Sequence, residues 1–323
     1  MKEKNILVTG GSGYIGSHTA HALAAHGYTT ILYDNLSTGD ARLAAGFEFV
    51  KGDISDAAKL APLLDRVDAV IHFAAHAYVG ESFVHPQKYF QNNVRDGLIL
   101  LDTVLRSPVR KFVFSSSCAI YGIPSRLPIS EDSPRMPINP YGATKLAFEN
   151  ALEAYDHAYG LRFVALRYFN AAGADEQGRV GEIHSPETHL IPSAFEAIQA
   201  ARPALEILGN DYPTPDGTCI RDYVHVSDLA EAHVLALEYL RESGSTAINL
   251  GSGKGHSVRE VIATVERITG SRVPVETKPR RPGDPAELVA DPSKTFTLLK
   301  WTAQRSLDDM ISSAWAWRRK RLG

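Results

Sequence analysis

The chain contains few cysteines, no long apolar run and no excess of one charge. Its 323 residues include only Cys118 and Cys219, too few for a disulfide framework, so we expect a reducing, cytoplasmic environment. Residues 4–9 are mainly apolar, but this run is too short for a signal peptide, and no apolar run of about 18 residues follows. The formal net charge of −3 predicts no general attraction to nucleic acid or to an anionic membrane.

Strand and helix patterns alternate through the first two-thirds of the chain. The expected strands are 5–9, 29–33, 48–50, 69–73, 111–115 and 162–167, and the expected helices are 17–26, 57–64, 89–105 and 143–159. This alternation predicts an α/β fold with a doubly wound parallel sheet and helices on both faces. We expect a first domain at 1–170 and a smaller C-terminal one at 171–323. A helix at 227–241 and a strand at 247–250 are expected to return to the first domain.

A glycine-rich turn, GGSGYIG at residues 10–16, joins the first expected strand to the first helix. Glycine permits close approach of the backbone to phosphate, and the helix N-terminus offers free N–H groups, so Gly10, Gly13 and Gly16 are predicted to bind a dinucleotide. Asp34 ends the second strand, where a carboxylate accepts hydrogen bonds from ribose hydroxyls and repels a 2′-phosphate. NAD is therefore predicted rather than NADP. Asp53, at the end of the third strand, is a candidate contact for the adenine.

Three polar side chains form the predicted catalytic set. Tyr141 and Lys145 are four residues apart at the start of an expected helix and so share one face. Ser117 follows a parallel strand at its carboxyl end, where open α/β sheets bind their ligands. A free tyrosine has a pKa of about 10, and we expect the Lys145 ammonium and an oxidised nicotinamide to lower the pKa of Tyr141. Together these groups suit removal of a hydroxyl proton while a hydride leaves the same carbon.

These motifs resemble those of the UDP-glucose 4-epimerases, which belong to the extended short-chain dehydrogenase/reductase family. The resemblance covers nearly the whole chain and includes segments 9–16, 33–36, 72–82, 92–94, 114–122, 140–145, 166–173, 209–223 and 280–284. It implies NAD-dependent epimerisation at C4 of a UDP-sugar, through a 4-keto intermediate, by a homodimer.

The resemblance also implies further binding residues. For the cofactor these are Tyr14, Ile15, Asn35, Ile54, Phe73, Ala74, Asn92, Ser115 and Tyr168, with Tyr141 and Lys145. For the substrate they are Asn170, His189, Leu190, Arg221, Arg281 and Asp284, with Ser117 and Tyr141.

Three positions depart from the family pattern. Ala77 replaces a lysine near the cofactor, and His189 replaces an asparagine near the substrate. Leu288 stands where side-chain bulk is thought to control access of N-acetylated sugars. The sequence therefore leaves three choices for the substrate: UDP-glucose/UDP-galactose, UDP-N-acetylglucosamine, and the pentose pair UDP-arabinose/UDP-xylose.

Two rival functions and a metal site are weighed against this interpretation. A sugar-nucleotide 4,6-dehydratase needs an Asp-Glu pair where this chain has Cys118-Ala119. A non-catalytic NAD-binding regulator has no need of the Tyr141 phenol. His72 and His76 are four residues apart, but His72 lies on a strand and no third ligand is suitably spaced, so no metal is predicted.

Overall fold

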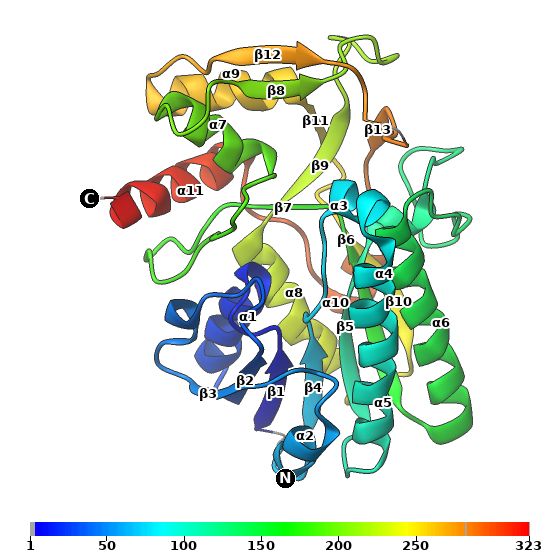
Figure 1. The fold of residues 1–323 in the computed structure, drawn as a ribbon. Coiled ribbons are helices and arrows are strands. Elements are labelled where there is room, and N and C mark those ends of the chain that lie inside the picture. The colour runs from blue at the N-terminus through cyan, green and yellow to red at the C-terminus, as the bar shows by residue number, and fades with distance from the viewer. Residues whose placement is uncertain (1–3, 282, 323) are drawn as a thin grey trace.

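A parallel sheet of seven strands forms the centre of the molecule. The computed structural model describes residues 4–281 and 283–322, and its sheet has the order β10-β6-β5-β4-β1-β2-β3 (Figure 1). The strands are β1 (Asn5–Thr9), β2 (Thr29–Asp34), β3 (Glu48–Lys51), β4 (Ala69–His72), β5 (Lys111–Ser117), β6 (Arg162–Tyr168) and β10 (Thr246–Leu250). The order reverses between β1 and β4, which is where doubly wound folds bind ligands. The predicted fold class is confirmed.

Helices cover both faces of this sheet. They are α1 (Tyr14–Ala25), α2 (Ala57–Leu64), α3 (Val79–Val84), α4 (Pro86–Tyr89), α5 (Gly97–Leu105), α6 (Pro140–Tyr159), α8 (Val226–Tyr239) and α10 (Ser293–Leu299), with short 3-10 turns η1 (Ala41–Ala44) and η3 (Cys118–Tyr121). Successive side chains of a strand point to opposite faces. Ile6 and Val8 accordingly belong to the core beneath α1 and α8, and Leu7 belongs to the core beneath α2, α5 and α6.

The single helix predicted at 89–105 is interrupted in the structure. Between α4 and α5 the chain forms a π-helical segment, η2 (Phe90–Asp96). Within it, the buried Asn93 amide accepts a hydrogen bond from His76 N and donates to His76 O, at 2.9 Å each, and donates to Thr144 Oγ1 at 3.1 Å. The altered helical geometry thus coincides with a side-chain clamp between the segment after β4 and helix α6, consistent with the frequent occurrence of π-bulges at functional sites.

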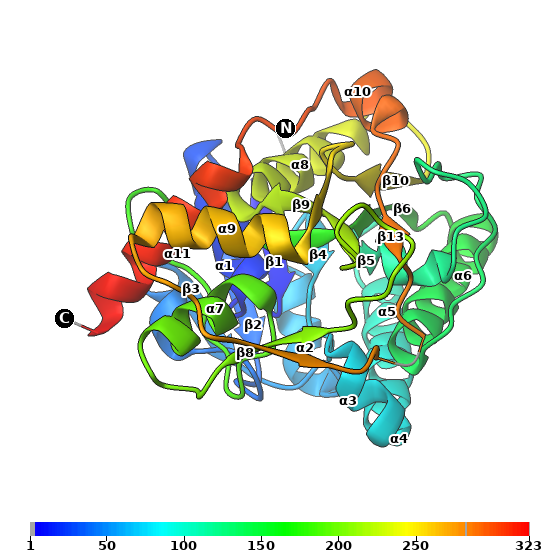
Figure 2. The same cartoon turned by 90° about the horizontal axis from the view of Figure 1, so that it is seen from above.

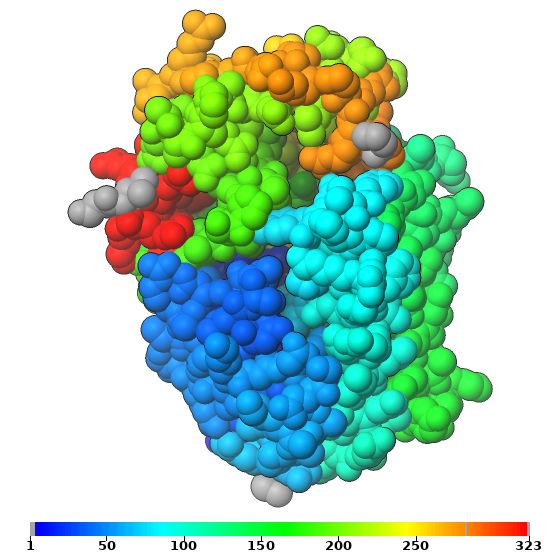
Figure 3. Space-filling view, viewed as in Figure 1, coloured from blue at the N-terminus to red at the C-terminus, as the bar shows by residue number. Residues whose placement is uncertain are grey.

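The later residues form a second part over the carboxyl ends of the sheet strands (Figures 1 and 2). Its elements are β7 (Asn170–Ala172), α7 (Leu190–Ile198), β8 (Leu205–Leu208), β9 (Ile220–His225), β11 (Gly255–Ser257), α9 (Val258–Thr269), β12 (Val275–Lys278), β13 (Glu287–Leu288) and α11 (Leu307–Leu322). The space-filling view shows a hollow along the boundary between the two parts (Figure 3).

Between these elements the chain returns twice to the central sheet, first with α8 and β10 and then with α10, which packs against both. Helix α8 packs against α1, and β10 pairs with β6 in parallel. The domain boundary at residue 170 stays a prediction. Among the residues that the structure describes, no helix is both long and apolar enough to cross a membrane.

Candidate active site

The glycine turn after β1 packs against the segment that follows β4. Gly10 has a φ of +72°, which favours glycine, and its N–H donates to Tyr33 O at 2.8 Å. A Cβ on Gly10 would lie 2.6 Å from Ala74 N, and one on Gly16 would lie 2.3 Å from Gly10 O. The turn therefore has no room for side chains at these two positions. It lies beside the reversal of strand order, where a dinucleotide pyrophosphate can reach the N-terminus of α1.

We expect Gly16→Ala to weaken NAD binding. The added methyl group must displace the turn from α1, and overpacking of this kind costs about 1–3 kcal/mol. If the whole penalty falls on binding, the Kd for NAD rises by about 5-fold to 150-fold. NAD titration measures the effect, with Gly244→Ala as control because a Cβ there meets nothing within 4 Å. An unchanged Kd in Gly16→Ala contradicts the role given to the turn.

Asp34 and Ser12 present polar groups beside this turn. The Asp34 carboxylate is buried, and it accepts hydrogen bonds from Ser12 N at 3.0 Å and Leu36 N at 2.8 Å. Burial raises the pKa of Asp34, while the two backbone donors act in the opposite direction. The buried Ser12 hydroxyl has no hydrogen-bond partner among the described residues. A carboxylate acceptor beside an unsatisfied hydroxyl fits the hydroxyl groups of a dinucleotide.

The residues predicted near the adenine form a hydrogen-bonded loop. Asn35 Nδ2 donates to Asp53 Oδ2 at 2.9 Å, and Ser55 donates to Asp53 Oδ1 through its backbone N–H and its hydroxyl. Burial acts to raise the pKa of Asp53, but these donors outweigh it and lower the pKa. The Ile54 side chain belongs to the hydrophobic core, which leaves its backbone as the available contact.

The other predicted cofactor residues lie mostly around the carboxyl ends of the strands. Gly13, Tyr14 and Ile15 lie at the start of α1, Phe73 and Ala74 follow β4, Ser115 and Tyr168 lie near the ends of β5 and β6, and Asn92 lies in η2. Tyr14 OH also donates to Gly173 O at 2.6 Å, which joins α1 to the segment after β7.

The structure brings Ser117, Tyr141 and Lys145 together. Tyr141 and Lys145 lie in the first turns of α6, and Ser117 ends β5. Lys145 Nζ donates to Ser115 O at 2.6 Å and lies 5.9 Å from the centroid of the Tyr141 ring. All three catalytic candidates are buried. A phenol, a hydroxyl and an amine thus share one site at the edge of the sheet.

The pKa of Tyr141 departs from the expectation. In the protein alone, burial raises it to about 12, and the hydrogen bond to Ser117 only partly opposes this change. Burial also lowers the pKa of Lys145 to about 7, with the Glu149 carboxylate acting in the opposite direction. The expected lowering is absent because burial penalises both the phenolate and the ammonium. An additional positive charge beside the phenol is needed to stabilise its anionic form.

The buried Lys145 predicts a specific dependence of stability on pH. Its pKa is about 7 in the folded chain against an ordinary value of 10.5, so the unfolded chain binds more protons between these pH values. The free energy of unfolding therefore gains a component that rises with pH from about 7 to 10.5. Urea unfolding of the parent and of Lys145→Met, without added dinucleotide, should show a smaller rise in the variant. Equal slopes for the two proteins would contradict a neutral, buried amine.

An ion pair beneath the catalytic set was not predicted from the sequence. Arg167 Nη2 lies 2.6 Å from Glu149 Oε2, and the Ser116 hydroxyl donates to Glu149 Oε1. Both charged side chains are almost fully buried. Arg167 also donates to Tyr121 OH at 2.9 Å. Glu149 follows Lys145 by one helical turn, and that spacing is the signal through which it could have been found.

Two of the predicted substrate residues, Asn170 and Arg221, belong to a second, four-stranded sheet. Asn170 starts β7 and is paired with Tyr223 of β9, while Leu288 of β13 is paired with Arg221 of β9. The Arg221 guanidinium is buried, and it donates to the Asp284 carboxylate and to Pro285 O. Arg221 and Asp284 therefore form an ion pair with each other.

Other predicted positions flank this sheet or the segment after β4. Arg281 is exposed in the loop before Asp284, and Leu190 begins α7. Ala77 is exposed after β4. His189 precedes α7, and its imidazole faces the Glu182 carboxylate. Burial acts to lower the pKa of His189, but Glu182 and Glu187 outweigh it and raise the pKa. The two carboxylates therefore favour the protonated imidazole at this position, and contact of His189 with the substrate stays a prediction.

Comparison with known families and structures identifies the class of this fold. Residues 6–251 match the model of the NAD dependent epimerase/dehydratase family. The chain belongs to this family. It is 50% identical over 319 residues to a UDP-glucose 4-epimerase of Halalkalibacterium halodurans, covering 98% of this chain and 96% of that protein.

Two solved structures share the whole architecture. The crystal structure of UDP-glucose 4-epimerase from Brucella ovis in complex with NAD is 52% identical, with a TM-score of 0.94, covering 97% of this chain and 98% of that one. The UDP-glucose-4-epimerase of Stenotrophomonas maltophila, with bound NAD and formylated UDP-arabinopyranose, is 40% identical. Its TM-score is 0.94, and the match covers 99% of each chain.

Proposed function

We propose that this chain is an NAD-dependent UDP-sugar 4-epimerase, with UDP-glucose and UDP-galactose as its most favoured pair. The observation that carries the proposal is the burial of Ser117, Tyr141 and Lys145 together at the carboxyl end of β5. They lie on the same edge of the sheet as the glycine turn. A hydroxyl group that enters this site can therefore meet a base and a dinucleotide together.

Each catalytic side chain has a distinct role in this proposal. Tyr141 takes the proton of the sugar C4 hydroxyl and later returns it, and Ser117 holds the same oxygen by a hydrogen bond. The Lys145 amine donates a hydrogen bond to Ser115 O. When this amine is protonated, its positive charge favours the phenolate form of Tyr141. NAD, when bound, supplies the acceptor and then the donor of the hydride at C4. Return of hydrogen to the other face of the ring requires that the sugar turns over while its nucleotide stays bound.

Different residues are proposed to bind the UDP part of the substrate and the NAD cofactor. Gly10, Gly13 and Gly16 hold the pyrophosphate of NAD, and Asp34 selects NAD against NADP by repelling a 2′-phosphate. Arg221 and Arg281 bind the diphosphate of the UDP-sugar, since guanidinium groups form paired hydrogen bonds with phosphate oxygens. The remaining cofactor and substrate residues predicted above complete the proposal.

The residues after Ser117 disfavour the dehydratase alternative. Cys118 is fully buried, and burial raises the pKa of its thiol to about 12. The neutral thiol and the following Ala119 offer no carboxyl group for the elimination of water. A pentose substrate is the second candidate, because the relative from Stenotrophomonas maltophila holds a UDP-arabinopyranose derivative.

Product analysis tests the function and the choice of sugar. Purified protein, without added cofactor, is incubated in turn with UDP-galactose, UDP-N-acetylglucosamine and UDP-xylose, and the products are separated by chromatography. Formation of UDP-glucose from UDP-galactose is the expected result. Conversion only of UDP-xylose reassigns the substrate to pentoses, and a 4-keto-6-deoxy product indicates a dehydratase. If the protein has NAD bound but converts none of these sugars, the result supports a non-catalytic NAD-binding regulator.

The proposal includes a cytoplasmic homodimer. Both cysteines are unpaired, which suits a reducing compartment. Helices α5 and α6 lie side by side (Figure 1) and carry partly exposed apolar residues, including Ile99 and Tyr155, on which a second copy can pack. Sedimentation equilibrium is expected to give twice the 35.2 kDa mass of the chain, and a monomer mass contradicts this part of the proposal.

A further inference from the structure

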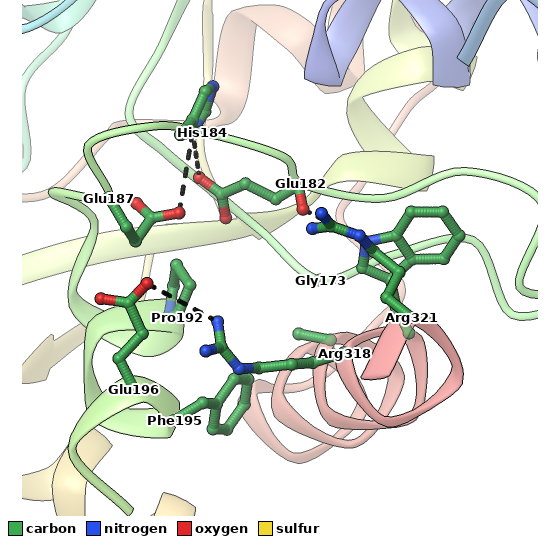
Figure 4. Close-up of a pocket in the computed structure, with 11 residues that line it drawn as sticks. Gly173, Glu182, His184, Glu187, Pro192, Phe195, Glu196, Arg318 and Arg321 are labelled. Atoms are coloured by element: carbon green, nitrogen blue, oxygen red, sulfur yellow. Dashed lines mark hydrogen bonds and ion pairs between the residues drawn. The ribbon is translucent and has the colours of Figure 1, made fainter. Parts of the chain in front are cut away.

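Four side chains converge in the loop between β7 and α7. Glu182, His184, Glu187 and His189 lie within a stretch of eight residues with the spacing E-x-H-x-x-E-x-H. His184 Nδ1 lies 2.9 Å from Glu182 Oε1 and 3.9 Å from Glu187 Oε2. His189 Nδ1 contacts the same oxygen of Glu182 and lies 3.5 Å from Glu187 Oε1. Figure 4 shows His184 between the two carboxylates.

The donor set has the chemistry of a transition-metal site. One ligand atom from each of the four residues lies within 4.8 Å of every other. Two imidazole nitrogens and two carboxylate oxygens are ligands that Zn²⁺ accepts in four-coordinate sites. The two carboxylates carry two negative charges, which one dication can balance.

Neighbouring groups fix the orientation of these ligands. The rings of Tyr14 and Tyr78 pack edge-on to the His184 imidazole, with centroid distances of 6.4 and 5.7 Å. Trp317 Nε1 donates to Glu182 O at 3.2 Å. The backbone N–H groups of residues 188 and 189 both donate to Glu187 Oε1 at 2.8 Å. The two bonds to Glu187 orient its carboxylate, as hydrogen bonds around metal ligands commonly do, while Trp317 holds the backbone of Glu182.

We propose that Glu182, His184, Glu187 and His189 bind one divalent cation of the zinc class. With four protein ligands the site is structural, since catalytic zinc keeps an open position. The ion holds together the loop that touches α1 through Tyr14 and α11 through Trp317, at the boundary between the two parts of the molecule. The site differs from the histidine pair at 72 and 76 considered in the sequence, and it takes His189 out of the proposed substrate set.

Zinc titration of the full-length protein, carrying its NAD, tests the site. After treatment with a chelator, calorimetric titration with Zn²⁺ is expected to give one ion per chain, with release of protons from the imidazoles. Titration with Co²⁺ should give the visible absorption of a tetrahedral complex. Failure to bind one ion per chain, or a Co²⁺ spectrum typical of octahedral coordination by water, overturns the proposal and leaves an ion-pair cluster.

Variants locate the bound ion. His184→Ala and Glu187→Gln are each expected to weaken Zn²⁺ binding by at least about 100-fold, because each removes a ligand. Glu196→Gln is the matched control, since Glu196 lines the same cavity but pairs with Arg202. Circular dichroism and NAD content verify that each variant is folded. Parent-like zinc affinity in both ligand variants, or equal weakening in Glu196→Gln, places the ion elsewhere and rejects this site.

Discussion

Tyr141→Phe is expected to lower the rate of epimerisation by about 100-fold to 10,000-fold, the range typical for loss of a positioned acid or base. The variant lacks only the phenolic oxygen of a buried side chain. The Ser117 hydroxyl cannot replace it, because a serine hydroxyl is a weaker base than a phenolate. The rate is measured by conversion of UDP-galactose to UDP-glucose.

The control for this experiment lies on the same helix. Tyr155 of α6 donates from its hydroxyl to Asp102 of α5 at 2.6 Å, in an exposed contact about four helical turns after Tyr141. Tyr155→Phe is expected to keep a parent-like rate, and Tyr141→Phe should keep the NAD content of the parent. A fast Tyr141→Phe variant removes this residue from the mechanism. A slow variant that has lost its NAD shows instead that Tyr141 supports binding of the cofactor.

Glu149→Ala is expected to destabilise the folded chain by about 3–5 kcal/mol, because it leaves the buried Arg167 guanidinium without its counter-ion. The carboxylate accepts hydrogen bonds from Arg167 Nη2 and from the Ser116 hydroxyl, which both lose their partner. The shift is measured from the urea concentration at the midpoint of unfolding. Because Ser116 lies between Ser115 and Ser117, we also expect a reduced epimerisation rate in this variant.

Two further variants separate the buried charge from a general effect on the helix. Glu153→Ala removes a half-exposed partner of Arg135 one turn further along α6, so a change below about 1 kcal/mol is expected. Combining Glu149→Ala with Arg167→Met removes the unpaired charge and should recover part of the lost stability. A loss from Glu149→Ala as small as that from Glu153→Ala is incompatible with a buried ion pair.

The central sheet could be predicted because its strands are short, apolar and separated by clear helical patterns. Each of its seven strands was placed within two residues of its bounds in the structure, including β10 after a long detour of the chain. Helix α7 and strands β8 and β12 were not predicted. These elements are short, and their sequences give little periodic signal before tertiary packing orders them. Helix α9 was also missed, although a capping box at Ser257 and Glu260 marks its start.

The grouping of the three catalytic candidates was accessible from the sequence because their spacing is local. Tyr141 and Lys145 lie on one helix, and Ser117 lies at the end of a recognisable strand. Contacts between distant segments were not accessible in this way. The Asn93 clamp joins residues 51 positions apart, and Glu149 and Arg167 meet only after β6 has paired with β5. The pKa values of Tyr141 and Lys145 also depend on burial, which a sequence pattern does not measure.

The late position of β10 in the chain affects how the molecule can assemble. Strand β6 lies next to β10 in the sheet, yet 77 residues separate its end at Tyr168 from the start of β10 at Thr246. During synthesis, the first six strands therefore leave the ribosome before the strand that covers their open edge. An uncovered strand invites pairing with other chains, and closing so large a loop is slow. A nascent chain that stops before residue 250 is thus the form most exposed to aggregation, and the form for which a chaperone has most to protect.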